Sequence, residues 1–178
     1  MKQRSRYSEP EAWSCACGDH WWAKLTKGFV VLVSPEDHHF LFDGNWTTQI
    51  APKRRYAKRG LSNNKTIFLH REILGDVIQV DHENMNGLDD RRHNIRPADA
   101  SGNAANCPKP RTANPTSQFK GVRHVRRRGR LSKPWLVMCA GQYIGYFSSE
   151  QDAALAYDKA AVKTYGPFAR TNIMRNAA

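Results

Sequence analysis

The residue types best suited to chemistry are Asp81 and His82, with Asn94 and Asn103 further along the chain. Hydrolysis of a phosphodiester needs an activated water and positive charge near the phosphate. A histidine can deprotonate water near neutral pH. Carboxylate and amide oxygens are hard ligands that suit Mg²⁺. The four residues together supply the parts of a metal-dependent phosphodiesterase.

The local geometry of Asp81 and His82 sets a condition on this centre. Adjacent residues of a strand point to opposite faces, so both side chains cannot serve one site on a flat strand. We therefore expect the strand to bend there and to end in the loop at Glu83-Asn84.

A second group of residues is suited to contacting nucleic acid. Residues 100–149 contain no Asp or Glu and are rich in Arg and Lys. In a β-sheet laid in the major groove, Arg can fork onto guanine edges and Lys can contact phosphates. The alternative is that residues 126–130 form a solvated hairpin turn. The predicted DNA-contacting residues are Lys120, Arg123, Arg126, Arg127, Arg128 and Trp135.

The elements around the first group are short. Strand-like runs occur at 29–33, 66–70 and 77–80, and residues 98–106 are rich enough in alanine for a short helix. The Pro-rich polar stretch at 108–116 reads as an extended linker. We therefore place a first domain at 1–107 and a second at 117–178.

The second domain has a clearer pattern. Strands are expected at 121–126, 135–140 and 143–147, with Gly141-Gln142 as a tight turn. Ser149 and Asp152 have the spacing of a capping box, which opens a helix to about Tyr165. The pattern predicts a three-stranded antiparallel sheet packed on one helix, and an α+β fold for the whole chain.

Charge and hydropathy restrict the partner. The net charge of +12 favours a polyanion, because each neutralised phosphate releases counterions. No apolar run approaches the roughly 18–20 residues that span a bilayer. No basic amphipathic helix, lipidation motif or secretory signal is evident. These observations favour double-stranded DNA over a membrane and predict a cytoplasmic location.

The cysteines allow a further interpretation. Cys15, Cys17 and His20 could hold zinc, although the spacing differs from a two-residue zinc knuckle and no second Cys/His pair follows at finger spacing. Cys107 and Cys139 are isolated. We expect ordinary reduced thiols, and a zinc-stapled binding protein stays an alternative.

Residues 80–96 resemble the HNH homing-endonuclease family. The matching motifs are Asp81-His82, Asn86-Gly87, Leu88-Asp89-Asp90-Arg91 and Asn94-Ile95-Arg96, and residues 65–75 are similar to the preceding stretch of phage members. The resemblance implies a ββα-metal core that grips Mg²⁺ or another divalent ion such as Mn²⁺. It implies His82 as the general base, Asp81 and Asn103 as metal ligands, and Asn94 as the brace of the hairpin that orients His82. Asp90 stands where the family usually has Asn.

Residues 117–172 resemble the ethylene-response-factor type of DNA-binding domain, the APETALA family. The matching motifs are Phe119-Lys120-Gly121-Val122-Arg123, Ile144-Gly145-Tyr146-Phe147 and the helix around Ala153-Ala154-Leu155-Ala156-Tyr157. The resemblance implies that Lys120, Arg123, Arg126 and Trp135 face DNA. Lys120 replaces the usual Arg, so a phosphate contact is expected there.

The function predicted from both halves is a metal-dependent DNA endonuclease, of a mobile and phage-borne homing type, acting in the host cytoplasm. The alternative is a non-catalytic, sequence-specific DNA-binding regulator. One centre per chain is compatible with a monomer that nicks or a homodimer that cuts both strands.

Overall fold

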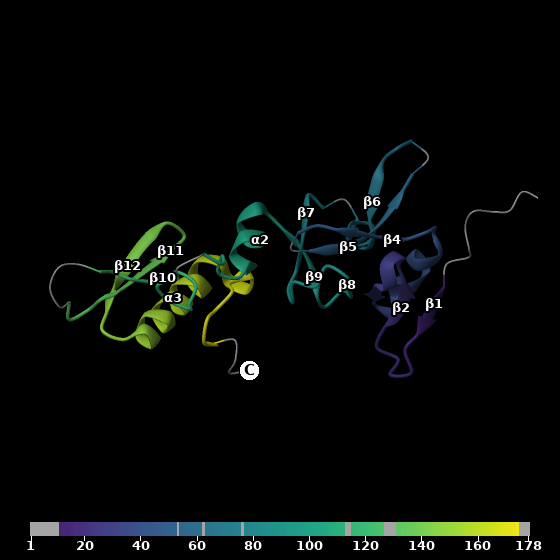
Figure 1. Cartoon of the computed structure of the whole chain (residues 1–178). Coiled ribbons are helices and arrows are strands. Elements are labelled where there is room, and N and C mark those ends of the chain that lie inside the picture. Colours follow the sequence, from purple (N-terminus) through teal and green to yellow (C-terminus); the bar gives the residue numbers. More distant parts are fainter. Residues whose placement is uncertain are drawn as a thin grey trace, which may run out of the picture. The chain divides into compact units, whose positions relative to one another are not determined.

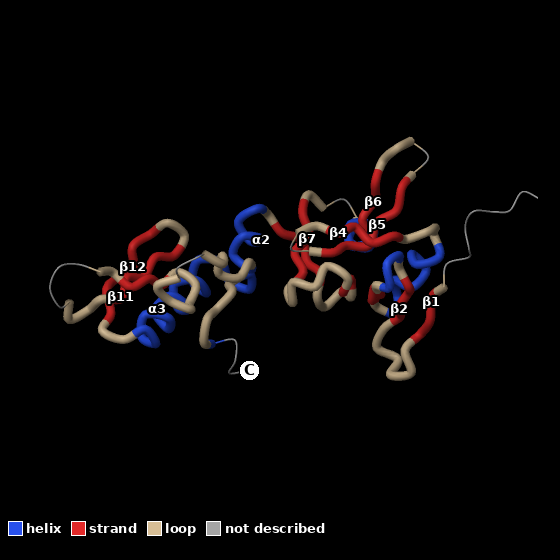
Figure 2. Tube along the Cα trace, in the orientation of Figure 1, coloured by secondary structure: helices blue, strands red, loops and turns tan. Residues whose placement is uncertain are grey.

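The computed structural model describes residues 11–52, 54–61, 63–75, 77–112, 115–126 and 131–174. The chain forms two compact units, Met1–Asp99 and Ala100–Ala178. Figures 1 and 2 show the short strands of the first unit and the sheet and long helix of the second. Within the described ranges, no helix is both long enough and apolar enough to cross a membrane.

The first unit begins with a four-stranded sheet. An antiparallel meander is formed by β1 (Ala12–Ser14), β2 (Trp21–Lys24) and β3 (Val30–Val33). The fourth strand, β8 (Asp89–Asp90), pairs parallel with β3. The Pro-led 3₁₀ helix Pro35–Phe42 follows β3, after a shorter one at Thr26–Gly28.

Two smaller sheets and a helix complete the first unit. The first sheet is antiparallel and contains β4 (Thr47–Ile50), β5 (Arg55–Gly60) and β6 (Thr66–Phe68). The second is the ribbon of β7 (Gln79–His82) and β9 (Ile95–Ala98). Helix α1 (Leu69–Leu74) directly follows β6. The elements share an apolar core that contains Val31, Val33, Leu41, Ala57, Leu69 and Ile95.

The second unit contains α2 (Ala100–Asn106), a three-stranded antiparallel sheet and α3 (Glu150–Tyr165). The strands are β10 (Val122–His124), β11 (Trp135–Cys139) and β12 (Gln142–Phe147), and a 3₁₀ turn at Gly166–Phe168 follows α3. Alanines on α3 let the helix lie close to the sheet, and its core contains Val122, Val137, Cys139, Ala153, Ala154 and Tyr157.

Close packing of α3 requires glycine at one position of the sheet. Gly121 has a φ of +73°, and a Cβ there would lie 2.0 Å from the ring of Tyr157. The segment 172–174 is held by the fully buried Asp158 of α3. The Asp158 carboxylate accepts hydrogen bonds from the backbone N–H groups of Asn172, Ile173 and Met174. These contacts hold the C-terminal segment against α3.

Comparison with the sequence predictions confirms the α+β class and the sheet and helix of the second unit. The capping box is present, because Ser149 Oγ accepts the N–H of Asp152 at 3.0 Å. The segment 69–70, expected as strand, opens α1 instead. The predicted domain boundary after 107 differs from the structure, in which α2 belongs to the second unit. The metal-binding part of the predicted ββα core stays a prediction.

Candidate functional site

The β7–β9 ribbon carries Asp81 and His82 at its end. The pairing is regular through Asp81↔Arg96 and His82↔Ile95, and the chain turns only afterwards, where Met85 N–H bonds to the His82 carbonyl at 2.9 Å. The strand ends at His82 and the chain turns at Glu83-Asn84, as expected, but no bend separates Asp81 from His82, because both residues keep their strand pairing. As adjacent strand residues, the two side chains meet different partners, Arg96 for Asp81 and Asp90 for His82.

The side chain of His82 lies in a buried cluster with Asp90 and His70. His82 Nε2 is 2.8 Å from Oδ1 of Asp90, and His70 Nδ1 is 3.9 Å from the same oxygen. Asp90 is fully buried, and both histidines are about 95% buried. His70 Nδ1 and Asp90 Oδ2 have no hydrogen-bond partner among the described residues. The cluster brings together β7, β8 and α1.

Burial controls the charge of two members of this cluster. Desolvation lowers the pKa of His70 to about 3, and the neighbouring His82 acts in the same direction. His70 is therefore neutral near pH 7. Burial raises the pKa of the Asp90 carboxyl, although its bond to His82 opposes the change. A carboxylate on one ring nitrogen fixes the orientation of the His82 imidazole.

Asn94 holds the loop that follows β7. Its Nδ2 donates to the Asp89 carbonyl at 2.7 Å, and its Oδ1 accepts the N–H of Asn84 at 2.9 Å. The Asp89 carboxylate in turn accepts hydrogen bonds from Arg91 at 2.7 and 2.8 Å, which stabilise the same loop. Asn94 thus braces the loop, and its effect on His82 catalysis stays a prediction.

Tyr56, on β5, was not recognised from the sequence. Its ring centroid lies 5.3 Å from that of His70 and 5.9 Å from that of His82. The approach depends on Gly87, where a Cβ would lie 2.5 Å from the Tyr56 ring. A tyrosine that lies about 25 residues before Asp81-His82 has no local sequence pattern that could reveal this contact.

The buried cluster permits two kinds of chemistry. His82 backed by Asp90 is an oriented imidazole of the kind used as a general base. Alternatively, His70, His82 and Asp90 offer ligand atoms that all lie within 4.8 Å of one another, which is compatible with a two-histidine, one-carboxylate metal site.

The residues predicted to hold Mg²⁺ are described separately, because they belong to different units. Asp81 is buried, and its Oδ2 accepts hydrogen bonds from Arg96 at 2.8 and 2.9 Å. Asn103 lies on α2. A carboxylate and an amide oxygen fit the donor chemistry of a hard divalent ion. The pairing of Asp81 with Asn103 stays a prediction.

The sheet of the second unit has an open face opposite α3. Val122 and Val137 point into the core, so their neighbours Arg123 and Leu136 point away from α3. The register places Arg123, Leu136 and Tyr146 side by side across the three strands. Arg123 is exposed and Tyr146 is 38% exposed, whereas Leu136 between them is buried.

An irregularity in the sheet adds a second tyrosine to this face. The register between β11 and β12 shifts at Val137/Met138, so Met138 pairs with Tyr143 whereas Val137 pairs with Gly145. Residues three apart on a regular strand point to opposite faces. Because of the shift, Tyr143 and Tyr146 lie together, with ring centroids 5.8 Å apart. Sequence alternation alone could not reveal this pair.

Trp135 has a different position from the predicted one. It pairs with Phe147 and lies two residues before Val137, on the face covered by α3. Its side chain is partly buried against the core, and its ring lies 4.8 Å from that of His124. The prediction that Trp135 faces DNA is therefore corrected, because strand alternation turns it towards the helix.

Lys120 also has a role that the sequence prediction missed. Its ammonium donates to the carbonyls of Ala105 and Cys107 at 2.6 and 2.7 Å. Burial lowers the pKa of this ammonium. Lys120 thus donates to backbone carbonyls at the end of α2, where a cation is favourable. The structure assigns it this helix contact in place of the phosphate contact expected from the sequence.

The predicted linker is similarly tied to the sheet. Lys109 donates through Nζ to the carbonyls of Ser117 and Phe119 at 2.7 and 2.8 Å. Burial lowers the pKa of its ammonium as well. Residue 109 is therefore part of the second unit and differs from the free extended linker expected at 108–116.

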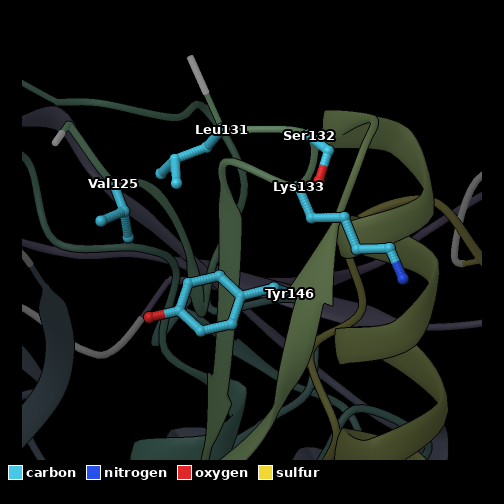
Figure 3. Close-up of a pocket in the computed structure, with 5 residues that line it drawn as sticks. All are labelled: Val125, Leu131, Ser132, Lys133 and Tyr146. Carbon is cyan, nitrogen blue, oxygen red and sulfur yellow. The ribbon is translucent and has the colours of Figure 1, made fainter. Parts of the chain in front are cut away.

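The basic hairpin next to the open face is described only in part. Arg126 is exposed, whereas Arg127 and Arg128 lie outside the described residues. A pocket of about 280 Å³ is lined by Val125, Leu131, Ser132, Lys133 and Tyr146. Figure 3 shows the Lys133 ammonium directed away from the Tyr146 ring. The pocket extends the open face towards the hairpin.

Comparison with known proteins gives one curated relative. The chain is 38% identical over 80 residues to Ethylene-responsive transcription factor 3 of Nicotiana tabacum. The chain resembles a plant transcription factor. The match covers 40% of this chain and 35% of the relative, so the chain spans about a third of that relative's length. No family model and no solved structure matches. The HNH resemblance stays a prediction.

The low pKa of His70 predicts acid sensitivity of the first unit. The pKa of the His70 imidazole is about 3 in the folded protein and about 6.5 in the unfolded chain. Its contribution to the stability of the fold is therefore complete above pH 6.5, and it is lost as the pH falls from there towards 3, because only the unfolded chain takes up the proton in this range. Between pH 8 and pH 5 we expect this group to cost about 2 kcal/mol of unfolding free energy. His70→Leu should flatten the dependence.

The measurement is urea unfolding followed by tryptophan fluorescence, since four of the five tryptophans lie in the first unit. Asp90, whose pKa is raised, acts in the opposite direction, so the slopes of wild type and variant are compared. His39→Leu, at an exposed histidine, is the matched control. Equal slopes for wild type and His70→Leu would contradict the prediction.

Proposed function

We propose that this protein binds duplex DNA through the open face of its second unit and cleaves DNA with its first unit. The binding part rests on Arg123, Tyr143 and Tyr146, which the sheet places together on an exposed surface. Similarity to a transcription factor and the net charge of +12 support it. In this proposal Arg123 and Arg126 contact base edges or phosphates, and the tyrosines pack on the groove wall.

Removal of Arg123 should weaken DNA binding. We expect Arg123→Ala to raise Kd for a duplex by about five- to thirty-fold and, where it contacts phosphate, to reduce the slope of log K against log[salt] by about 1. Fluorescence anisotropy at several salt concentrations measures both. Lys159→Ala, which removes an exposed cation from α3 on the other side of the sheet, is the matched control. An equal loss in both variants would indicate non-specific attraction only.

The cleavage part of the proposal is carried by one observation, the buried hydrogen bond between His82 and Asp90. We infer that His82 takes a proton from a water in line with the scissile phosphate. Asp90 holds the imidazole in one orientation, and Tyr56 packs beside it. Asn94 keeps the loop beyond β7 in place. In this proposal Asp90, Tyr56 and Asn94 position His82 and its loop without contacting DNA themselves.

By the family resemblance, Asp81 of the first unit and Asn103 of α2 are each candidate ligands for the divalent cation, Mg²⁺ or Mn²⁺. Bound there, the cation would supply positive charge at the phosphate and at the departing 3′ oxygen. In the structure Arg96 neutralises the Asp81 carboxylate. We propose that this ion pair opens when the centre is loaded. One centre per chain is compatible with nicking by a monomer or double-strand cleavage by a homodimer.

Nicking of supercoiled plasmid tests the enzyme. We expect relaxation with Mg²⁺ or Mn²⁺, none with EDTA, and a loss of about 10²–10⁴ in rate for His82→Gln. Glutamine can still donate to Asp90 but cannot act as the base. His93→Gln, an exposed histidine of the same loop, should cleave normally.

The second candidate function is a DNA-binding regulator without catalysis. The ion pair between Asp81 and Arg96 favours it, because it occupies a proposed ligand, and the curated relative is a transcription factor. A chain that binds DNA but fails to nick under Mg²⁺ and Mn²⁺ would establish this candidate and rule out the enzyme.

A further inference from the structure

The hairpin turn between β1 and β2 collects three metal-ligating side chains. Cys15 N–H bonds to the His20 carbonyl at 2.9 Å, which closes the loop across its ends. Gly18 N–H bonds to the Cys15 carbonyl at 2.9 Å, and Gly18 has a φ of +77°. This tight turn brings Cys17 close to both Cys15 and His20. Cys15, Cys17 and His20 are thus close together in space, although their spacing along the sequence differs from that of a two-residue zinc knuckle.

The donor atoms converge at one point of the turn. The Sγ atoms of Cys15 and Cys17 are 2.8 Å apart, and Cys17 Sγ is 3.5 Å from Nδ1 of His20. The three ligand atoms lie within 4.8 Å of one another. Cys17 is exposed and the other two are half-buried, so an ion can reach them from solvent.

A backbone donor faces one of the two sulfur atoms. The Cys17 N–H points at Cys15 Sγ at 3.5 Å. Backbone donors of this kind support charge on sulfur. Arg91 lies near enough to interact with Cys17 and Asp19, while its own charge is balanced by Asp89.

We propose that Cys15, Cys17 and His20 form a zinc site. Two thiolates and one imidazole are a donor set that suits Zn²⁺ and does not suit Mg²⁺. Water or the Asp19 carboxylate supplies the fourth ligand. The ion would fix the β1–β2 hairpin, and β2 pairs with β3, the neighbour of β8. This site is separate from the DNA-cleaving centre and does not rest on the proposed function.

Zinc titration of the reduced full-length chain tests the site. Competition with a chromogenic chelator should give one tightly held zinc per chain, and Co²⁺ in its place should show sulfur-to-cobalt charge-transfer absorption. Cys17→Ser and His20→Ala should each weaken zinc binding at least tenfold. Cys107→Ser is the matched control for a thiol outside the cluster, and His82→Gln is the control for the other candidate metal cluster.

The outcomes separate the alternatives. Retention of one zinc by Cys107→Ser and His82→Gln, with loss in Cys17→Ser, supports the proposal. Failure of the reduced wild-type chain to bind zinc overturns it. Zinc that persists in both Cys17→Ser and His20→Ala but disappears in His82→Gln also overturns it, because the ion then belongs to the buried His70, His82 and Asp90 cluster. Neither result depends on whether the protein cleaves DNA.

Discussion

A carboxyl group with no access to solvent needs a hydrogen-bond partner inside the protein. In the first unit Asp90 is such a group, and its partner is His82. Asp90 reaches full burial because β8 pairs with β3. An uncompensated buried charge is costly, so the bond to His82 is a condition of the fold and at the same time fixes the imidazole. The N-terminal meander therefore helps to position the proposed base. It contains β3, β3 pairs with β8, and Asp90 of β8 bonds to His82.

The second unit separates its cations into two groups. Lys109 and Lys120 are turned inward onto backbone carbonyls, where they hold the entry to the sheet and the end of α2. Arg123 and Arg126 are left on the outside. The register shift in β12 then adds Tyr143 to the face that carries Arg123 and Tyr146. Charge alone therefore does not define the proposed DNA surface; strand alternation and one irregularity decide which basic and aromatic side chains belong to it.

Local pattern was sufficient for the sheet and helix of the second unit, because strand alternation, a glycine turn and a capping box are short-range signals. It was insufficient for Trp135 and Lys120, whose direction depends on register and on a helix fifteen or so residues away. In the first unit the motif around His82 is visible in the sequence. The contribution of Tyr56 is not, because a long-range contact and the space left at Gly87 create it.

In the proposed function the second unit binds DNA and the first unit cleaves it, and single-turnover cleavage with protein in excess over labelled plasmid tests this separation of roles most directly. We predict that Arg123→Ala raises the protein concentration needed for half-saturation and leaves the saturated rate unchanged. We predict that His82→Gln lowers the saturated rate by about 10²–10⁴ and leaves the protein concentration for half-saturation unchanged. A saturated rate that falls in Arg123→Ala, or one that stays at the wild-type value in His82→Gln, would contradict this separation of roles.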